Sequence, residues 1–252
     1  MRIATRILLA TVAAIVLSAA LRAGTTKGDA VQFVNGKDTV NGFLVQPEKP
    51  GRYAAIVVAP EWRGMTDWVK EQASKLAEQG YVALVVDFYG GKVASNPEEA
   101  SDLAQSVSSA TAVGDLRAAI TYLQTAKEVD RDHIAAIGWG TGGGYVAKLA
   151  TQEPRLGGVI VNYGMLPTDP NDMQLIGAPM LGNFGAEDHG VPEKDVRSFE
   201  KFMKTLQRRV DIKVYDGAGN QFANSTNTQA YRPAAAEDAW KRTVDFLGRT
   251  MK

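Results

Sequence analysis

The chain has 252 residues, and its 28 lysines and arginines balance its 28 aspartates and glutamates, so the formal net charge is zero at neutral pH. This balance leaves no basic field to hold nucleic acid or an anionic membrane, and we expect neither as a partner. The lack of cysteine excludes disulfides, thiolate nucleophiles and thiolate metal sites, and with only two histidines we expect no metal site.

The N-terminal segment has the order of charged, apolar and small residues that is typical of an export signal. Arg2 and Arg6 precede an apolar run at residues 7–16, and small residues follow up to Ala23. The run is shorter than the roughly 20 residues that span a bilayer, although an uncleaved membrane anchor is the alternative. We therefore expect a cleaved signal peptide at residues 1–23. The mature domain, residues 24–252, should be periplasmic or secreted and not stably bound to the membrane.

The mature chain opens with strand-like sequence. Residues 31–34 and 42–46 flank the turn-rich residues 35–38, which predicts an antiparallel pair. Short, continuous apolar runs follow, and they predict strands buried on both faces of a parallel sheet. These runs are residues 54–59, 82–86, 134–137, 158–161 and 179–183. A final segment at residues 210–214 alternates apolar and polar side chains, which predicts a strand near the edge.

Amphipathic segments lie between the predicted strands and predict helices. They are residues 67–79, 97–126, 143–150, 193–207 and 234–250. Strands and helices alternate without a linker-like segment, so we predict a single α/β domain with a doubly wound, mostly parallel sheet flanked by helices. Ligands of such sheets bind beyond the carboxyl ends of the strands, and functional residues are therefore sought in the loops that follow the strands.

The loop at residues 138–144 reads Gly-Trp-Gly-Thr-Gly-Gly-Gly and allows two interpretations. The first is the dinucleotide fingerprint G-x-G-x-x-G, which needs an acidic residue at the end of the next strand to bind the ribose. That strand ends near Asn162, and the next acidic residue is Asp169. The motif also follows several earlier strands instead of the first one. We therefore expect no dinucleotide and no other cofactor.

The second interpretation is a nucleophile elbow, G-x-Nuc-x-G, in which a sharp turn from strand to helix lifts the central side chain into the site. Gly138 and Gly142 fit the pattern, and the central residue is Gly140. Glycine adopts strained backbone angles with little penalty. We expect that Gly140 relaxes the turn and removes the nucleophile.

The order of the chain supports the elbow, because α/β-hydrolases place nucleophile, acid and histidine in that order after successive strands. Asp188 follows the predicted strand at residues 179–183 and is the candidate acid. The histidine should follow residues 210–214, where Asn220 stands after Gly-Ala-Gly. An amide has no useful basicity near neutral pH, so Asn220 cannot act as a general base.

These motifs together closely resemble the dienelactone hydrolase family of the α/β-hydrolase superfamily. The similar segments extend from about residue 31 to the C-terminus. They include residues 60–64, 87–91, 138–144, 185–192 and 217–222. The resemblance implies an α/β-hydrolase fold and an activity that opens lactones and esters with a cysteine or serine, an aspartate and a histidine. It also implies a small ester-like or lactone-like ligand as the partner.

Transferred to this sequence, the resemblance puts the nucleophile at Gly140, the acid at Asp188, the histidine at Asn220 and a pocket glutamate at Glu61. Two of these four groups are lost, and Asp188 has no evident partner to orient. The oxyanion hole would consist of the backbone N–H groups of Thr141 and Trp62, which do not depend on the side chain. A binding pocket can therefore persist without turnover.

Other side chains near the site have simpler interpretations. Arg63 is expected to pair with Glu61 and line the mouth of the pocket, with a polar ligand as the alternative partner of the two side chains. Tyr89 and Trp139 are expected to line the pocket or the core. His189 is interpreted as a solvated loop residue, and His133, before its strand, as a structural residue at the opposite end of the sheet.

Three functions follow from this sequence. The first is an exported, catalytically impaired relative of the dienelactone hydrolases. The second is an active ester or lactone hydrolase that uses unconventional groups such as Thr141, His189 or Glu61. The third is a non-catalytic binding or interaction protein.

Overall fold

The computed structural model of the protein describes residues 28–251. The predicted signal peptide, residues 1–23, lies outside the described residues and stays a prediction. Within the part of the chain that the structure describes, no helix has the length and apolar character needed to cross a membrane.

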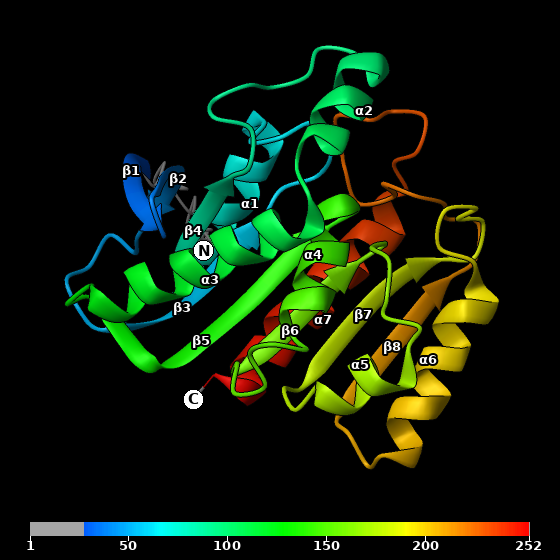
Figure 1. The fold of residues 1–252 in the computed structure, drawn as a ribbon. Coiled ribbons are helices and arrows are strands. Elements are labelled where there is room, and N and C mark those ends of the chain that lie inside the picture. The colour runs from blue at the N-terminus through cyan, green and yellow to red at the C-terminus, as the bar shows by residue number, and fades with distance from the viewer. Residues whose placement is uncertain (1–27, 252) are drawn as a thin grey trace, which may run out of the picture.

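The fold is built on one eight-stranded sheet whose strands lie in the order β1-β2-β4-β3-β5-β6-β7-β8 (Figure 1). Strand β2 pairs antiparallel with β1 and β4, and all the other pairs are parallel. The strands are β1 (Gly28–Asn35), β2 (Asp38–Val45), β3 (Tyr53–Ala59), β4 (Val82–Asp87), β5 (Val129–Trp139), β6 (Gly158–Asn162), β7 (Met180–Gly185) and β8 (Val210–Tyr215). The predicted doubly wound, mostly parallel sheet and the opening antiparallel pair are confirmed.

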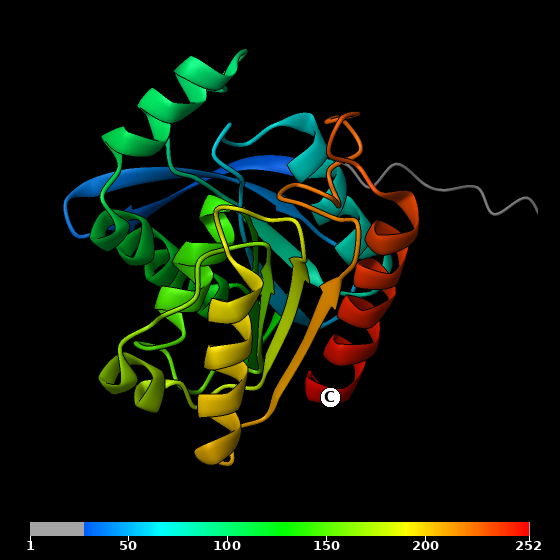
Figure 2. The ribbon, with the colours of Figure 1, turned by 90° about the vertical axis from the view of Figure 1, so that its right-hand side faces the viewer.

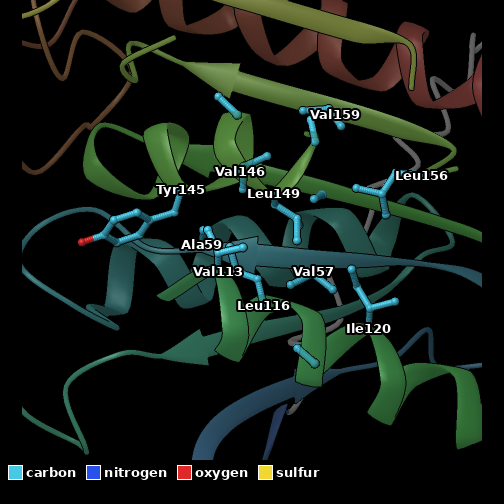
Figure 3. Close-up of a cluster of buried hydrophobic side chains, with 14 of the residues drawn as sticks. Val57, Ala59, Val113, Leu116, Ile120, Tyr145, Val146, Leu149, Leu156 and Val159 are labelled. Carbon is cyan, nitrogen blue, oxygen red and sulfur yellow. The ribbon is translucent and has the colours of Figure 1, made fainter. Parts of the chain in front are cut away.

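Helices cover both faces of this sheet (Figure 2). One face carries α1 (Asp67–Glu78) and α7 (Pro233–Thr250), and the other carries α3 (Ser109–Thr125), α4 (Thr141–Leu149) and α6 (Glu193–Thr205). The central strands are apolar on both sides because each of their faces packs against a helical layer. Figure 3 shows one layer, where Val57 of β3 and Val159 of β6 pack with Leu116 of α3 and Leu149 of α4.

Two helical details differ from the prediction. The segment at residues 97–126 forms two helices, α2 (Pro97–Ser106) and α3, because the backbone of Val107 is extended and the Ser108 hydroxyl caps α3 by accepting the Thr111 N–H at 3.0 Å. A short helix, α5 (Pro170–Leu175), was not predicted, and the Asp169 side chain caps it. The hydrophobic periodicity of the sequence does not indicate where either of these N-terminal caps lies.

Candidate functional site

The turn between β5 and α4 places Gly140 at the carboxyl edge of the sheet. Its φ of 51° and ψ of −119° are angles that residues with a side chain rarely adopt. The turn thus keeps a positive φ at its centre, which glycine adopts with little penalty. Packing around the turn explains this: a β-carbon on Gly142 would overlap the carbonyl oxygens of Ala59 and Pro60, so the helix start lies directly against the loop after β3.

These close contacts predict opposite effects for two Gly→Ala substitutions. Gly142→Ala should lower the free energy of unfolding by about 1–3 kcal/mol or more, because the new methyl meets rigid backbone. Gly248→Ala, in α7 with nothing within 4 Å of its β-carbon position, should raise it by roughly 0.5–1 kcal/mol. Equilibrium denaturation of both variants checks this, and equal effects would show that the turn is not tightly packed.

The space in front of Gly140 is open. A β-carbon built there would meet only two ring carbons of Tyr163, each at 4.0 Å. This distance is an ordinary van der Waals contact, so the position could hold a small side chain without a clash. The elbow therefore retains the place for a nucleophile, and only the reactive atom is missing.

Asp188 and Asn220 lie together beside the same cavity. Asp188 is buried after β7, and its Oδ1 accepts the N–H groups of Gly190 and Val191 at 2.8 and 3.1 Å. Its Oδ2 accepts the Asn220 Nδ2–H at 2.9 Å. The expectation that Asp188 has no partner is thus corrected, because the amide at the histidine position takes its hydrogen bond. An amide held in this way can donate a hydrogen bond but cannot take up a proton.

Glu61, in the loop after β3, is a buried carboxylate that accepts hydrogen bonds from two side chains. The Tyr163 hydroxyl donates to its Oε1 at 2.9 Å, and the Asn224 Nδ2–H donates to its Oε2 at 2.8 Å. Burial raises the pKa of Glu61 above its ordinary value, and it outweighs these two hydrogen bonds, which act in the opposite direction. Burial and the nearby Glu61 also raise the pKa of Tyr163, so this hydroxyl stays protonated and acts as the donor.

The cavity at this edge has a volume of about 590 Å³. Its wall contains six residues that the sequence assigned to the site's chemistry, namely Glu61, Trp62, Gly140, Thr141, Asp188 and Asn220. Sequence reasoning did not single out the other lining residues, which include Ser109, Tyr145, Tyr163, Met165, Val191 and Gln221. A volume of this size is within the usual range of about 300–1,000 Å³ for small-molecule sites.

Three N–H donors of residues in the cavity wall have no protein acceptor among residues 28–251. The indole N–H of Trp62 is buried and has no hydrogen-bond partner among residues 28–251. In the same described range, no protein acceptor takes the backbone N–H of Trp62 or of Thr141. Buried donors are normally paired, so unpaired ones beside a cavity mark a place where a ligand oxygen can bind. The two backbone donors belong to the predicted oxyanion hole.

Three predicted binding residues lie elsewhere. Arg63 makes no ion pair with Glu61 within the described chain; its guanidinium donates to the carbonyl of Ser95 at 3.2 Å and so holds two loops together. Tyr89 is buried beneath Gly64, and Trp139 packs edge-on against Trp68 on the other face of the sheet. A residue that neighbours a site residue in the sequence therefore does not have to point its side chain into the site.

The two histidines lie away from the cavity wall. His189 is exposed on its loop, as interpreted from the sequence. His133 lies early in β5, at the opposite end from Gly140, and its Nδ1 is 2.9 Å from an Asp130 carboxylate oxygen. Across residues 28–251, no cluster of three or more His, Asp or Glu side chains is arranged to hold a metal ion.

Sequence reasoning missed Tyr163 and Asn224. Tyr163 has a φ of 41°, a left-handed conformation that is rare for an aromatic residue, and Gln221 in the cavity wall has a φ of 61°. Such strained residues concentrate at functional sites. No pattern in the sequence gives a backbone angle, although the position of Tyr163 directly after a buried strand could have drawn attention to it.

Comparison with known proteins gives consistent results. The model of the dienelactone hydrolase family matches residues 40–251. A protein of Bradyrhizobium sp., named "Probable 2-oxo-3-(5-oxofuran-2-ylidene)propanoate lactonase", is 30% identical over 226 residues, which cover 84% of this chain and 90% of that protein. The solved structure of a dienelactone hydrolase-like promiscuous phosphotriesterase from metagenomic libraries superposes with a TM-score of 0.83. It is 23% identical and covers 91% of this chain and all of its own, so it supports the fold.

Proposed function

This chain belongs to the dienelactone hydrolase family, and we propose that it is a catalytically impaired member that retains the pocket for a small ester-like or lactone-like ligand. The observation that carries the proposal is the pair of residues at the reacting centre. The elbow presents Gly140, and the acid Asp188 is hydrogen-bonded to Asn220 at 2.9 Å. Attack on a carbonyl needs a nucleophile and a base that accepts its proton, and neither position supplies such a group.

Binding has more support than turnover. The cavity of about 590 Å³ is open, and the N–H groups of Thr141 and Trp62 are available to a carbonyl oxygen. Such donors bind the oxygen whatever side chain stands at the elbow. The Bradyrhizobium relative, which carries the name of a lactonase, supports the choice of ligand class. We place this function outside the cytoplasm, as the N-terminal sequence predicts.

The rival, an active hydrolase with unconventional groups, lacks an activated nucleophile. Thr141 lines the cavity, but its hydroxyl has no carboxylate or imidazole within hydrogen-bond distance among the described residues. His189 is exposed, and Glu61 is held by Tyr163 and Asn224. A group without a base or a lowered pKa is a weak nucleophile.

A panel of variants tests the proposal against this rival. Hydrolysis of 4-nitrophenyl acetate by Thr141→Ala, His189→Ala and Glu61→Gln should equal the weak rate of the parent protein, within about twofold. The oxyanion donors alone can leave some acceleration over water, so a weak parental rate agrees with the proposal. A tenfold or larger loss in one correctly folded variant would instead identify a working catalytic group and overturn it.

A further inference from the structure

The charges around the cavity at Gly140 discriminate between the ligands that its volume can hold. Among residues 28–251, the wall contains two carboxyl groups, those of Glu61 and Asp188, and no lysine, arginine or histidine. All the other lining residues are uncharged. An imbalance of this kind acts on a charged ligand more strongly inside a cavity than in water, because the protein walls screen charge less than water does.

Both carboxyl groups lie close to the reacting centre. The ring of Tyr163 faces Gly140, and the hydroxyl of the same tyrosine donates to Glu61 at 2.9 Å. The Asn220 amide lies between the Tyr163 carbonyl, at 3.4 Å, and Asp188, at 2.9 Å. Both oxygens of Asp188 accept N–H groups, which suits the ionised carboxylate and not the acid. A ligand at Gly140 is therefore bound beside negative charge.

The nearest cation along the chain, Arg63, does not balance this charge for a ligand. Its side chain is not part of the wall, and its guanidinium donates to the Ser95 carbonyl at 3.2 Å. Burial raises the pKa of Glu61, and Arg63 opposes this increase less than Asn224 and Tyr163 do. A carboxylate on the ligand would thus leave water without gaining an ion pair, which is unfavourable.

One part of the wall does favour negative charge, and a neutral ligand satisfies it. Helix α4 begins at Thr141, and the N-terminus of a helix carries a partial positive charge equivalent to roughly half an elementary charge. The carbonyl oxygen of an ester or lactone meets this end with its partial negative charge. It does so without placing a formal charge beside Asp188.

These observations extend the function proposed above, on which they rest. We propose that the cavity selects esters and lactones that carry no negative charge. In this respect its ligand differs from the propanoate in the name of the Bradyrhizobium relative. The selectivity comes from the two carboxyl groups of the wall and from the direction of Arg63, which turns away from the cavity.

Two aromatic lactones of nearly the same shape, coumarin-3-carboxamide and coumarin-3-carboxylate, test the proposal because they differ by one negative charge. In the ¹⁵N-labelled protein, the carboxamide should shift the indole N–H resonance of Trp62 saturably. The carboxylate should bind at least tenfold more weakly at low ionic strength. Trp68, Trp139 and Trp240 line a different cavity, and their resonances should stay unchanged. Equal or tighter binding of the carboxylate, or shifts of these three resonances alone, would overturn the proposal.

A charge added to the wall tests the same selectivity from the side of the protein. Met165 lines the cavity and is 71% exposed, so Met165→Arg places a cation at the mouth without disturbing the core. It should reduce the preference for the carboxamide by about two- to fivefold, and added salt should restore that preference. Met165→Gln, a neutral side chain of similar length, should leave the preference unchanged. Equal effects of the two variants would contradict the proposal.

The possible results separate this inference from the function on which it rests. If neither lactone binds, the cavity does not retain a pocket for such ligands, and both proposals fail. If the carboxamide is opened at an ordinary enzyme rate of about 1–10³ s⁻¹, the catalytic impairment is wrong, whereas a tenfold preference over the carboxylate still supports the selectivity. If both lactones bind equally well without turnover, only the selectivity is wrong.

Discussion

The double variant Gly140→Cys with Asn220→His is expected to hydrolyse 4-nitrophenyl acetate about 10²–10⁴-fold faster than either single variant. The physical reason is that a nucleophile and its base act as a unit, so each alone adds little. The place for both exists: a β-carbon at Gly140 meets nothing closer than Tyr163 at 4.0 Å, and residue 220 is already within hydrogen-bond distance of Asp188.

Two controls accompany this gain of activity. Adding Asp188→Asn to the double variant should remove most of the gain, because the new histidine then loses the carboxylate that orients it. Gly140→Cys alone should be less stable than the parent by about 1–3 kcal/mol, since cysteine must adopt the φ of 51°. A double variant that is folded and as inactive as the parent would show that residues 140 and 220 do not mark the reacting centre.

Glu61→Leu is expected to lower the free energy of unfolding by about 2–6 kcal/mol. It leaves two buried donors, the Tyr163 hydroxyl and the Asn224 amide, without an acceptor, and each unpaired group costs about 1–3 kcal/mol. Asn224 cannot turn to repair the loss, because its Oδ1 already accepts the N–H and hydroxyl of Thr226. Urea denaturation gives the value.

The matched control is Glu61→Gln, which keeps the shape and offers an acceptor and a donor to the same two partners. It should be much more stable than Glu61→Leu. If both variants lose the same free energy of unfolding, then the hydrogen bonds of Glu61 do not contribute to stability and only its shape does.

The same carboxylate makes stability depend on pH. Burial raises the pKa of Glu61 in the folded protein above its ordinary value of 4.5. At pH values between 4.5 and this raised pKa, the folded state therefore binds more protons than the unfolded state. The contribution of this group is therefore complete below pH 4.5 and is lost as the pH rises through the folded pKa. Glu61→Gln should lack that loss, so its stability relative to the parent should increase with pH across this window.

Those parts of the site that depend on the order of the chain could be predicted from the sequence. Gly140, Asp188 and Asn220 each follow a strand that a continuous or alternating apolar pattern marks, and parallel strands bring their carboxyl ends to one edge. The break at Val107 could not be predicted in this way, because the amphipathic pattern continues through both helices around it and predicts a single helix.

The parts that depend on side-chain direction could not be predicted. Arg63 and Glu61 are two residues apart, yet one turns to the carbonyl of Ser95 and the other into the cavity. The contact of Asn224 with Glu61 joins residues 163 positions apart, and no local pattern encodes it. The hydrogen bond between Asp188 and Asn220 has a different basis: an amide without useful basicity still donates a hydrogen bond, and the fold brings an acceptor within 2.9 Å of it.

The turnover number of the parent protein on an activated ester tests the account most directly. Residues 24–252, purified without the predicted signal peptide, are mixed with 4-nitrophenyl acetate, and the release of 4-nitrophenolate is followed against the reaction in buffer. We predict a rate far below 1 s⁻¹, at the level that oxyanion donors give without a nucleophile. A turnover number in the ordinary range of about 1–10³ s⁻¹ would contradict the proposal that Gly140 and Asn220 disable the reacting centre.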